Sequence, residues 1–336
     1  MQRSLVLASL LVAVSACGSS PRPTARPAQH GTRATHEPAR RGKSAATPSR
    51  LARPSRLSLV GTRKLPFAVQ LPAAAVRGRQ VFAAGGLDAA DASLATVVRV
   101  SPGAPRTVLE LPQAIHDAGA ATLGSTVYVF GGGTATGPTD AIVAVRAGKA
   151  RTVGHLPQPS SDLEAVTAGG RIVVIGGYSA TKPLRDVLAF TPRGRITRIA
   201  RLPHALRYAA AARTGTQVLV AGGTDGTHAR ADVLRIDPGR GTVRRIGRLP
   251  GPLAHVAGAA LGDTFYVFGG RGDSLTSQRR TIYAIDPVTG VVRSAGRLPV
   301  ALSDLTVVAA GGRLYALGGR DRTGRVHDRL LEYAPR

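Results

Sequence analysis

Polar and ionisable residues recur at one fixed position along this 336-residue chain, six residues after the leucine of each of six Leu-Pro pairs. The residues at that position are Leu71, Asp117, Asp162, Tyr208, His255 and Asp304, and those just before them are Gln70, His116, Ser161, Arg207, Ala254 and Ser303. If the three aspartates converge, their carboxylates could bind a hard cation, or the hydroxyls and amines of a polar ligand. Whether these carboxylates lie close together depends on the fold that the repeat forms.

The candidate ligand-binding residues are polar members of these two sets: His116, Asp117, Ser161, Asp162, Arg207, Tyr208, His255, Ser303 and Asp304. A structural role is the alternative, because Asp and Ser at the start of a strand often bind backbone amides nearby. We name no catalytic residue and no metal ligand. The histidines are scattered without metal-ligand spacing, and the sequence has no G-x-S-x-G or H-E-x-x-H string.

A diglycine ends a short apolar run six times, and the repeat predicts the fold. The first glycines are Gly85, Gly131, Gly176, Gly222, Gly269 and Gly318, with steps of 46, 45, 46, 47 and 49 residues. A unit of this length cannot bury its own apolar face, so neighbouring units must pack side by side. Runs such as "STVYVFGG" are typical of strands buried on both faces, and "DVLRIDP" and "TVRRIGRLP" add further strands. Four strands in each of six units predict an all-β fold, a six-bladed β-propeller.

The two ends of the repeat region predict how the ring closes. The sixth unit stops after its third strand, "RLLEYAP", with no fourth strand behind it. The segment from Leu57 to Leu65, "LSLVGTRKL", aligns on its Leu-Pro with the fourth strands of other units. We therefore expect this N-terminal strand to complete the last blade, which leaves no unpaired edge at the seam.

Taken together, residues 57–336 resemble the kelch repeat family. The matching features are the diglycine after the second strand, the aromatic or aliphatic residue before an Asp-Pro turn, and the turn "DPVTG" itself. One departure is systematic, because small aliphatics such as Val243 and Val292 stand where the family usually has Trp in the fourth strand. The resemblance implies that the first strand of each unit lines a central channel. It also implies that both candidate sets surround one mouth of that channel, a face kelch propellers commonly use for recognition.

The same resemblance leaves an enzymatic alternative open. Galactose oxidase shares the kelch propeller and needs a cysteine crosslinked to tyrosine at its copper, whereas the mature domain here has no cysteine. A sugar-processing activity, like that of the kelch sialic acid epimerases or of a hydrolase, needs none. In that interpretation Arg207, His255 and Asp304 are the first residues to consider. Whether the chain is an enzyme stays uncertain, and a binding role is favoured.

The first residues predict export and anchoring. Arg3 precedes an apolar run from Leu5 to Val14, and small residues lead to Cys17, the only cysteine of the chain. This arrangement resembles the lipobox of bacterial lipoproteins, which implies a signal peptide over 1–16 and an acylated Cys17 that binds membrane lipid. The Pro- and Arg-rich segment 17–56 has too little apolar surface to fold and is expected to be a tether. An ordinary secretory signal is the alternative.

Charge restricts the partners. The net charge of +26 favours polyanions, but no nucleic-acid-binding pattern accompanies it, so we expect no nucleic-acid partner. The sequence therefore predicts a lipid-anchored, extracytoplasmic monomer without a cofactor, which binds a protein or glycan at the propeller face. A sugar-processing enzyme is the alternative function.

Overall fold

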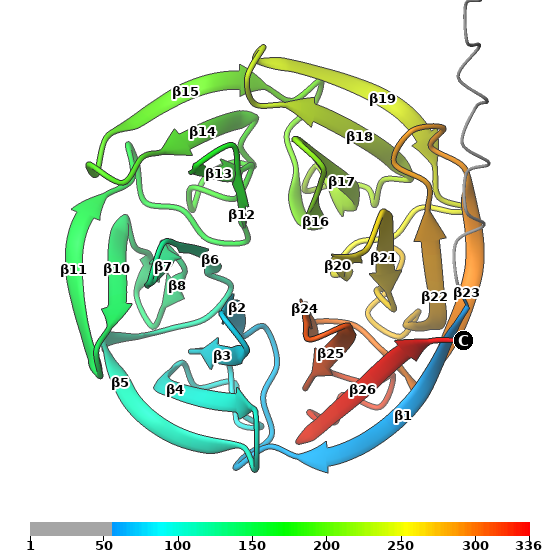
Figure 1. Ribbon diagram of the computed structural model, residues 1–336, viewed down its shortest axis with the longest axis horizontal. Coiled ribbons are helices and arrows are strands. Elements are labelled where there is room, and N and C mark those ends of the chain that lie inside the picture. The colour runs from blue at the N-terminus through cyan, green and yellow to red at the C-terminus, as the bar shows by residue number, and fades with distance from the viewer. Residues whose placement is uncertain (1–55) are drawn as a thin grey trace, which may run out of the picture. The chain divides into compact units, whose positions relative to one another are not determined.

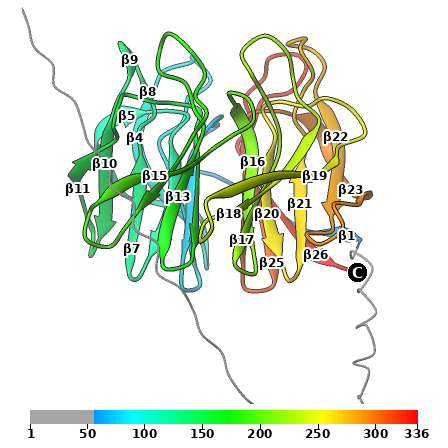
Figure 2. The ribbon, with the colours of Figure 1, turned by 90° about the horizontal axis from the view of Figure 1, so that it is seen from above.

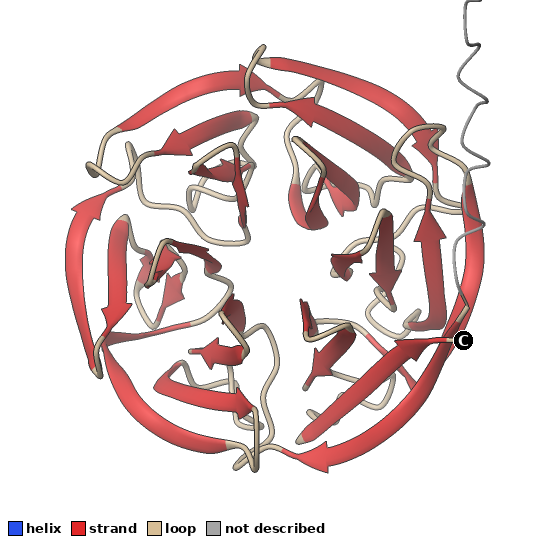
Figure 3. Cartoon of the chain, in the orientation of Figure 1, coloured by secondary structure: helices blue, strands red, loops and turns tan. Residues whose placement is uncertain are grey.

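The computed structural model describes residues 56–336, and every regular element in that range is a β-strand (Figure 3). Six four-stranded sheets, here called blades, stand around a central axis (Figure 1). The predicted all-β, six-bladed propeller is confirmed. No helix among these residues is long and apolar enough to cross a bilayer. The predicted signal peptide, Cys17 and the tether up to residue 55 lie outside the described residues.

Each blade runs from an inner strand at the axis to an outer strand at the rim. The inner strands are β2 (Ala73–Arg77), β6 (Gly119–Leu123), β12 (Glu164–Ala168), β16 (Arg207–Thr214), β20 (Ala257–Leu261) and β24 (Thr306–Ala310). The second strands are β3 (Gln80–Ala84), β7 (Thr126–Phe130), β13 (Arg171–Ile175), β17 (Gln217–Thr224), β21 (Thr264–Phe268) and β25 (Arg313–Leu317). The third strands are β4 (Leu94–Ser101), β10 (Ala141–Arg146), β14 (Asp186–Phe190), β18 (Asp232–Asp237), β22 (Arg279–Ile285) and β26 (Arg329–Pro335).

The outer strands complete the six sheets. They are β5 (Arg106–Ile115), β11 (Lys149–His155), β15 (Ile196–Arg201), β19 (Thr242–Arg248), β23 (Val292–Leu302) and, for the sixth blade, β1 (Leu57–Lys64). A short hairpin of β8 (Gly133–Thr134) and β9 (Gly137–Pro138) extends the loop after the second diglycine. Seen from the side, the strands run along the axis and the loops gather at its two ends (Figure 2).

The diglycines join each blade to the next. Gly269 has φ +58°, and a Cβ on it would lie 2.3 Å from the carbonyl oxygen of Leu302, the last residue of β23, where the chain passes to the sixth blade. The amide of Gly270 donates a hydrogen bond of 2.9 Å to that same oxygen. All six diglycines share this arrangement: the first allows the close approach, and the second donates to a carbonyl of the segment that leads into the next blade.

The ring is closed by the strand that the sequence analysis assigned to the last blade. β1 pairs antiparallel with β26, from Leu57 opposite Pro335 to Lys64 opposite Arg329, with a register shift between Leu59 and Gly61. First and last strands of the repeat region therefore share one sheet, which protects the edge at the seam.

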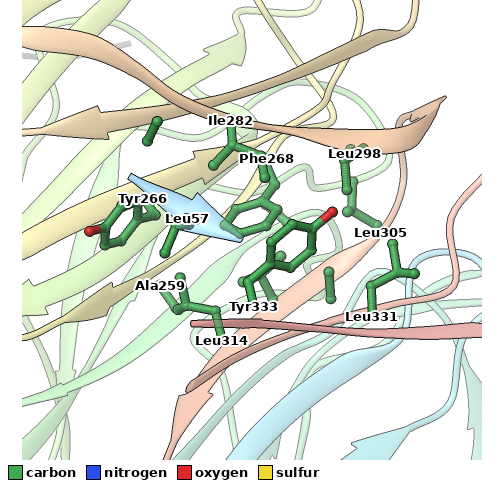
Figure 4. Close-up of a cluster of buried hydrophobic side chains, with 14 of the residues drawn as sticks. Leu57, Ala259, Tyr266, Phe268, Ile282, Leu298, Leu305, Leu314, Leu331 and Tyr333 are labelled. Carbon is green, nitrogen blue, oxygen red and sulfur yellow. The ribbon is translucent and has the colours of Figure 1, made fainter. Parts of the chain in front are cut away.

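Apolar side chains fill the interfaces between blades. In the interface of the fifth and sixth blades, the Phe268 and Tyr333 rings meet edge to face with centroids 5.4 Å apart (Figure 4). Leu57 of the closing strand is buried in the same cluster. At the other interfaces Val243 and Val292 pack against the cores, so aliphatic residues fill the positions where the resemblance would place Trp.

Candidate functional site

Six residues in the left-handed region of backbone space surround the axis, one at or just before the start of each inner strand. These ring residues are Leu71 (φ 56°), Asp117 (53°), Asp162 (57°), Tyr208 (54°), His255 (53°) and Asp304 (60°). Non-glycine residues rarely adopt this conformation, which costs about 1 kcal/mol or more each. The residue just before each ring residue pairs with the loop that follows a diglycine, as with Ser161 and Tyr178 or Ser303 and Arg320.

Backbone hydrogen bonds connect the ring residues from blade to blade. They run from Leu71 N to Asp304 O (2.7 Å), Asp117 N to Leu71 O (3.1 Å), Asp162 N to Asp117 O (2.8 Å), Tyr208 N to Asp162 O (3.2 Å) and Asp304 N to His255 O (3.3 Å). Because main-chain atoms make these connections, the aspartate side chains are not needed for them. Leu71 shares the conformation without a polar side chain, so the strained backbone serves the architecture and the side chains remain for another use.

The ring residues line a cavity of about 390 Å³ that follows the inner strands along the axis, called the channel below. Its wall consists largely of Ala, Gly, Val and Thr. Four carboxyl groups also reach it, from Asp117, Asp162, Glu164 and Asp304. The basic side chains in the wall are Arg213 and His255. The channel is therefore small-walled and rich in carboxyl groups.

Arg207 binds Asp162 at the mouth. One guanidinium nitrogen of Arg207 lies 2.5 Å from Asp162 Oδ2, and that aspartate is buried. The guanidinium also lies over the Tyr178 and Tyr208 rings, 4.2 and 4.5 Å from their centroids. Two cation–π contacts and one ion pair hold this arginine in place.

His255 connects the fifth blade to the sixth. Its Nδ1 forms a short contact with Asp304 Oδ1, and Ser303 donates to Asp304 Oδ2 at 2.5 Å. The Nε2 atom of His255 lies 2.8 Å from a guanidinium nitrogen of Arg271. Since a guanidinium only donates, Nε2 must accept and Nδ1 must carry the proton toward Asp304. Both ring nitrogens are thus occupied within the protein.

The carboxyl groups at the mouth differ in their pKa values. Burial, followed by the neighbouring carboxylates of Asp162 and Asp304, raises the pKa of Asp117 well above its usual value. Burial also raises the pKa of Asp162, although Arg207 opposes that shift. Burial alone would raise the pKa of Asp304, but His255, Ser303 and Arg271 lower it below its usual value. Neighbouring carboxyl groups at the mouth therefore have pKa values shifted in opposite directions.

A second hollow, called the cleft below, adjoins the channel over the fourth and fifth blades. Its volume is about 300 Å³, and Arg207, Tyr208, His255, Arg271 and Asp273 are among the residues in its wall. Carboxyl groups line the channel, and two guanidinium groups line the cleft. Tyr208 and His255 line both hollows and therefore lie between the acidic and the basic side chains.

The structure brings together only part of the predicted set. Asp117, Asp162, Tyr208, His255 and Asp304 line the channel, and Arg207 lines the cleft. The other three predicted residues line neither hollow.

Two of those three are buried, and the third is held by the first blade. Ser303 is fully buried and serves Asp304, while Ser161 is buried and pairs with Tyr178. His116 is half-buried, and its Nδ1 lies 2.9 Å from the Ser93 hydroxyl.

Sequence reasoning missed Glu164. It lies two residues after a ring residue, where the other blades have Ala73, Gly119, Ala210, Ala257 and Thr306. One acidic residue among small ones at an equivalent position was the signal that could have found it. Arg271 was noticed only as a loop residue, and its contact with His255 depends on side-chain geometry that the spacing does not contain.

The described residues contain no group of three or more His, Cys, Asp or Glu side chains placed to hold a metal ion. The carboxyl groups of the channel must therefore be interpreted through their hydrogen bonds and charges.

Comparison with known proteins supports the architecture. No family model and no curated protein matches the chain. Among solved structures, that of YjhT is similar, with a TM-score of 0.69 over 80% of this chain and 95% of that chain, at 15% sequence identity. At this identity the likeness shows the fold alone, and it agrees with the six-bladed propeller.

Proposed function

We propose that this chain is a membrane-anchored, extracytoplasmic kelch-repeat binding protein that captures a protein or glycan at the channel mouth. One observation supports this most strongly: the ring is built by backbone hydrogen bonds, and its polar side chains face free space in the channel. Polar groups around a preformed cavity are the usual arrangement of a binding site. The two occupied nitrogens of His255 favour binding over proton transfer.

The anchor and location rest on the sequence. Acylated Cys17 would hold the protein on a membrane, and residues 17–56 would carry the propeller away from it. We infer a monomer that uses no cofactor and binds no nucleic acid. A Cys17→Ser variant should move from the membrane fraction to the soluble fraction of fractionated cells. Retention of that variant in the membrane fraction would remove the lipid anchor from the proposal.

Capture from intact cell envelopes tests the binding function. The test variant replaces Asp117, Asp162 and Asp304 by Asn, which keeps side-chain size and removes the charges. The control is Asp263→Asn, an exposed carboxylate in the turn between β20 and β21. We expect the triple variant, but not the control, to lose the captured protein or glycan while melting cooperatively. Equal capture by all three proteins would end the channel-mouth proposal.

A sugar-processing enzyme, isomerase or hydrolase, is the second candidate. The observation that favours it is the raised pKa of Asp117 near the His255–Asp304 pair, since these groups together could serve as acid and base. NMR of N-acetylneuraminic acid should then show faster exchange between its anomers with the wild type than with Asp304→Asn. No acceleration by the wild type would remove the epimerase-like form of this candidate.

A further inference from the structure

Glu164 is the least explained charged group of the channel. It opens β12 and lines the cavity together with Ala209 and Ala211 of the neighbouring inner strand, β16. Within residues 56–336 its carboxyl group has neither a hydrogen-bond nor an ion-pair partner. Burial raises its pKa to about 8. Glu164 is half-buried, and among the described residues its carboxyl group lacks the hydrogen-bond or ion-pair partner that acids removed from water usually have.

Asp117 lies on the adjacent inner wall and is in a similar state. Its carboxyl group accepts a long hydrogen bond of 3.5 Å from the Tyr208 hydroxyl, and it forms no ion pair among the described residues. Asp162 and Asp304, by contrast, are matched by Arg207 and His255. Two of the four channel carboxyl groups are thus matched inside the protein and two are not. Glu164, which has no partner in the described part of the chain, is therefore where a ligand could supply a positive charge.

We propose that the channel binds a primary ammonium group, with Glu164 as its counter-ion, and that the ligand is a sugar unit with a free amine. This rests on the proposed glycan-binding function and specifies its ligand. An ammonium donates three hydrogen bonds and needs only a few acceptors. A hard metal ion needs six or more oxygen ligands, and the described residues hold no such group.

The surroundings favour an amino sugar over a lysine of a protein partner. A cavity of about 390 Å³ is within the usual range for a small ligand. Around the mouth, Tyr208 and Arg207 offer hydrogen-bond partners for sugar hydroxyls. The chain carries a net charge of +26, which repels cationic proteins, whereas a single amine on an otherwise uncharged sugar enters the carboxyl-lined channel without that penalty.

Binding should release a proton. At pH 6 the Glu164 carboxyl is mostly protonated in the free protein, because its pKa is about 8, and the amine of a free amino sugar is mostly ammonium. An ammonium group pairs with the carboxylate, so the proton of Glu164 leaves to the buffer when the amine binds. Proton release is a signature that a merely structural glutamate would not give.

Isothermal titration calorimetry on the detergent-solubilised full-length protein tests the inference. The probes are a chitosan tetramer, whose amines are free, and a chitin tetramer of the same length, whose amines are acetylated. Titrations at pH 6, where the sugar amines are already mostly ammonium, in phosphate and in bis-Tris, which differ in ionisation enthalpy, count the protons released. We expect the chitosan tetramer to bind at least about tenfold more tightly and to release close to one proton.

Glu164→Gln should lower the affinity for the chitosan tetramer at least about tenfold and reduce proton release to near zero. Glu110→Gln, on the exposed outer strand β5, is the matched control and should change neither. Thermal melts check that both variants fold.

Four results would overturn the inference: equal affinity for the two tetramers, an unaltered Glu164→Gln variant, no binding of the chitosan tetramer, or Glu164-dependent binding of CaCl₂ instead. Mouth-dependent binding of the chitin tetramer would leave the proposed glycan-binding function standing. Only failure of the envelope capture would remove that function.

Discussion

The Tyr208 ring lies stacked on the His255 imidazole, with centroids 3.7 Å apart and an angle of 23° between the planes. This contact joins the fourth blade to the fifth. Beside Tyr208, Arg207 binds Asp162 of the third blade, and His255 binds Asp304 of the sixth. A continuous path of contacts therefore crosses the mouth from the third blade to the sixth. Residues coupled in this way should respond to substitution as a unit.

The first prediction concerns the His255–Asp304 pair. Either Asp304→Asn or His255→Gln should lower the free energy of unfolding by about 3 kcal/mol, because each breaks a buried pair and leaves one partner uncompensated. The double variant should lose clearly less than the sum of the two single losses. Urea denaturation of the four proteins measures this. Strictly additive losses would show that the two side chains are not energetically coupled.

The second prediction is a pH dependence of stability that belongs to Glu164. Its pKa is raised to about 8, so the folded state keeps a proton that the unfolded chain loses near pH 4.5. The contribution of Glu164 is complete below the unfolded value and is lost as the pH rises toward 8, by about 1.4 kcal/mol per pH unit for one proton.

Urea denaturation between pH 5.5 and 7.5 therefore should show a shallower decline for Glu164→Gln than for the wild type. Asp117 and Asp162 titrate in both proteins, so the difference between the two slopes isolates Glu164. The exposed Glu110→Gln variant should follow the wild type. If the Glu164→Gln slope equals that of the wild type, the carboxyl is not held in its protonated form.

The third prediction separates close packing from backbone strain in the diglycine motif. Gly269 and Gly262 lie in the same blade and both have φ +58°, but only a Cβ on Gly269 would meet a neighbouring backbone atom, at 2.3 Å. Gly262→Ala should cost about 1 kcal/mol from the left-handed conformation alone. Gly269→Ala should cost at least about 2 kcal/mol more, because the carbonyl of Leu302 must move. Equal losses in thermal or urea unfolding would contradict the blade-contact role.

The repeat predicted the architecture well because its signals are local. Each diglycine position must be glycine for a contact made in every blade, and the strand beginning at Leu57 could be assigned by its alignment with other fourth strands. The ring positions followed from the same spacing, since one backbone conformation recurs at all six.

Side-chain partners were harder to predict because they break the symmetry of the repeat. The Tyr208–His255 stack and the contact of Arg271 with His255 each occur in one place and depend on rotamers. Ser161 and Ser303 share the spacing of Arg207 but turn into the protein. Glu164 was not predicted because only the fifth and sixth residues after each leading leucine were considered. At its own position, the eighth, the other units have small residues.

The fourth prediction tests the closing strand with two leucines of β1. Leu57 is 5% exposed and packs with Phe268 and Tyr333, whereas Leu59 is 42% exposed. Leu57→Ala should lower the free energy of unfolding by about 2–4 kcal/mol, because it leaves a cavity at the seam between the fifth and sixth blades. Leu59→Ala in the same strand should change it by less than about 0.5 kcal/mol. Similar small effects of both substitutions in urea denaturation would mean that the β1 side chains contribute little to closing the ring. The expected contrast would show that this buried leucine, as well as backbone pairing, stabilises the seam.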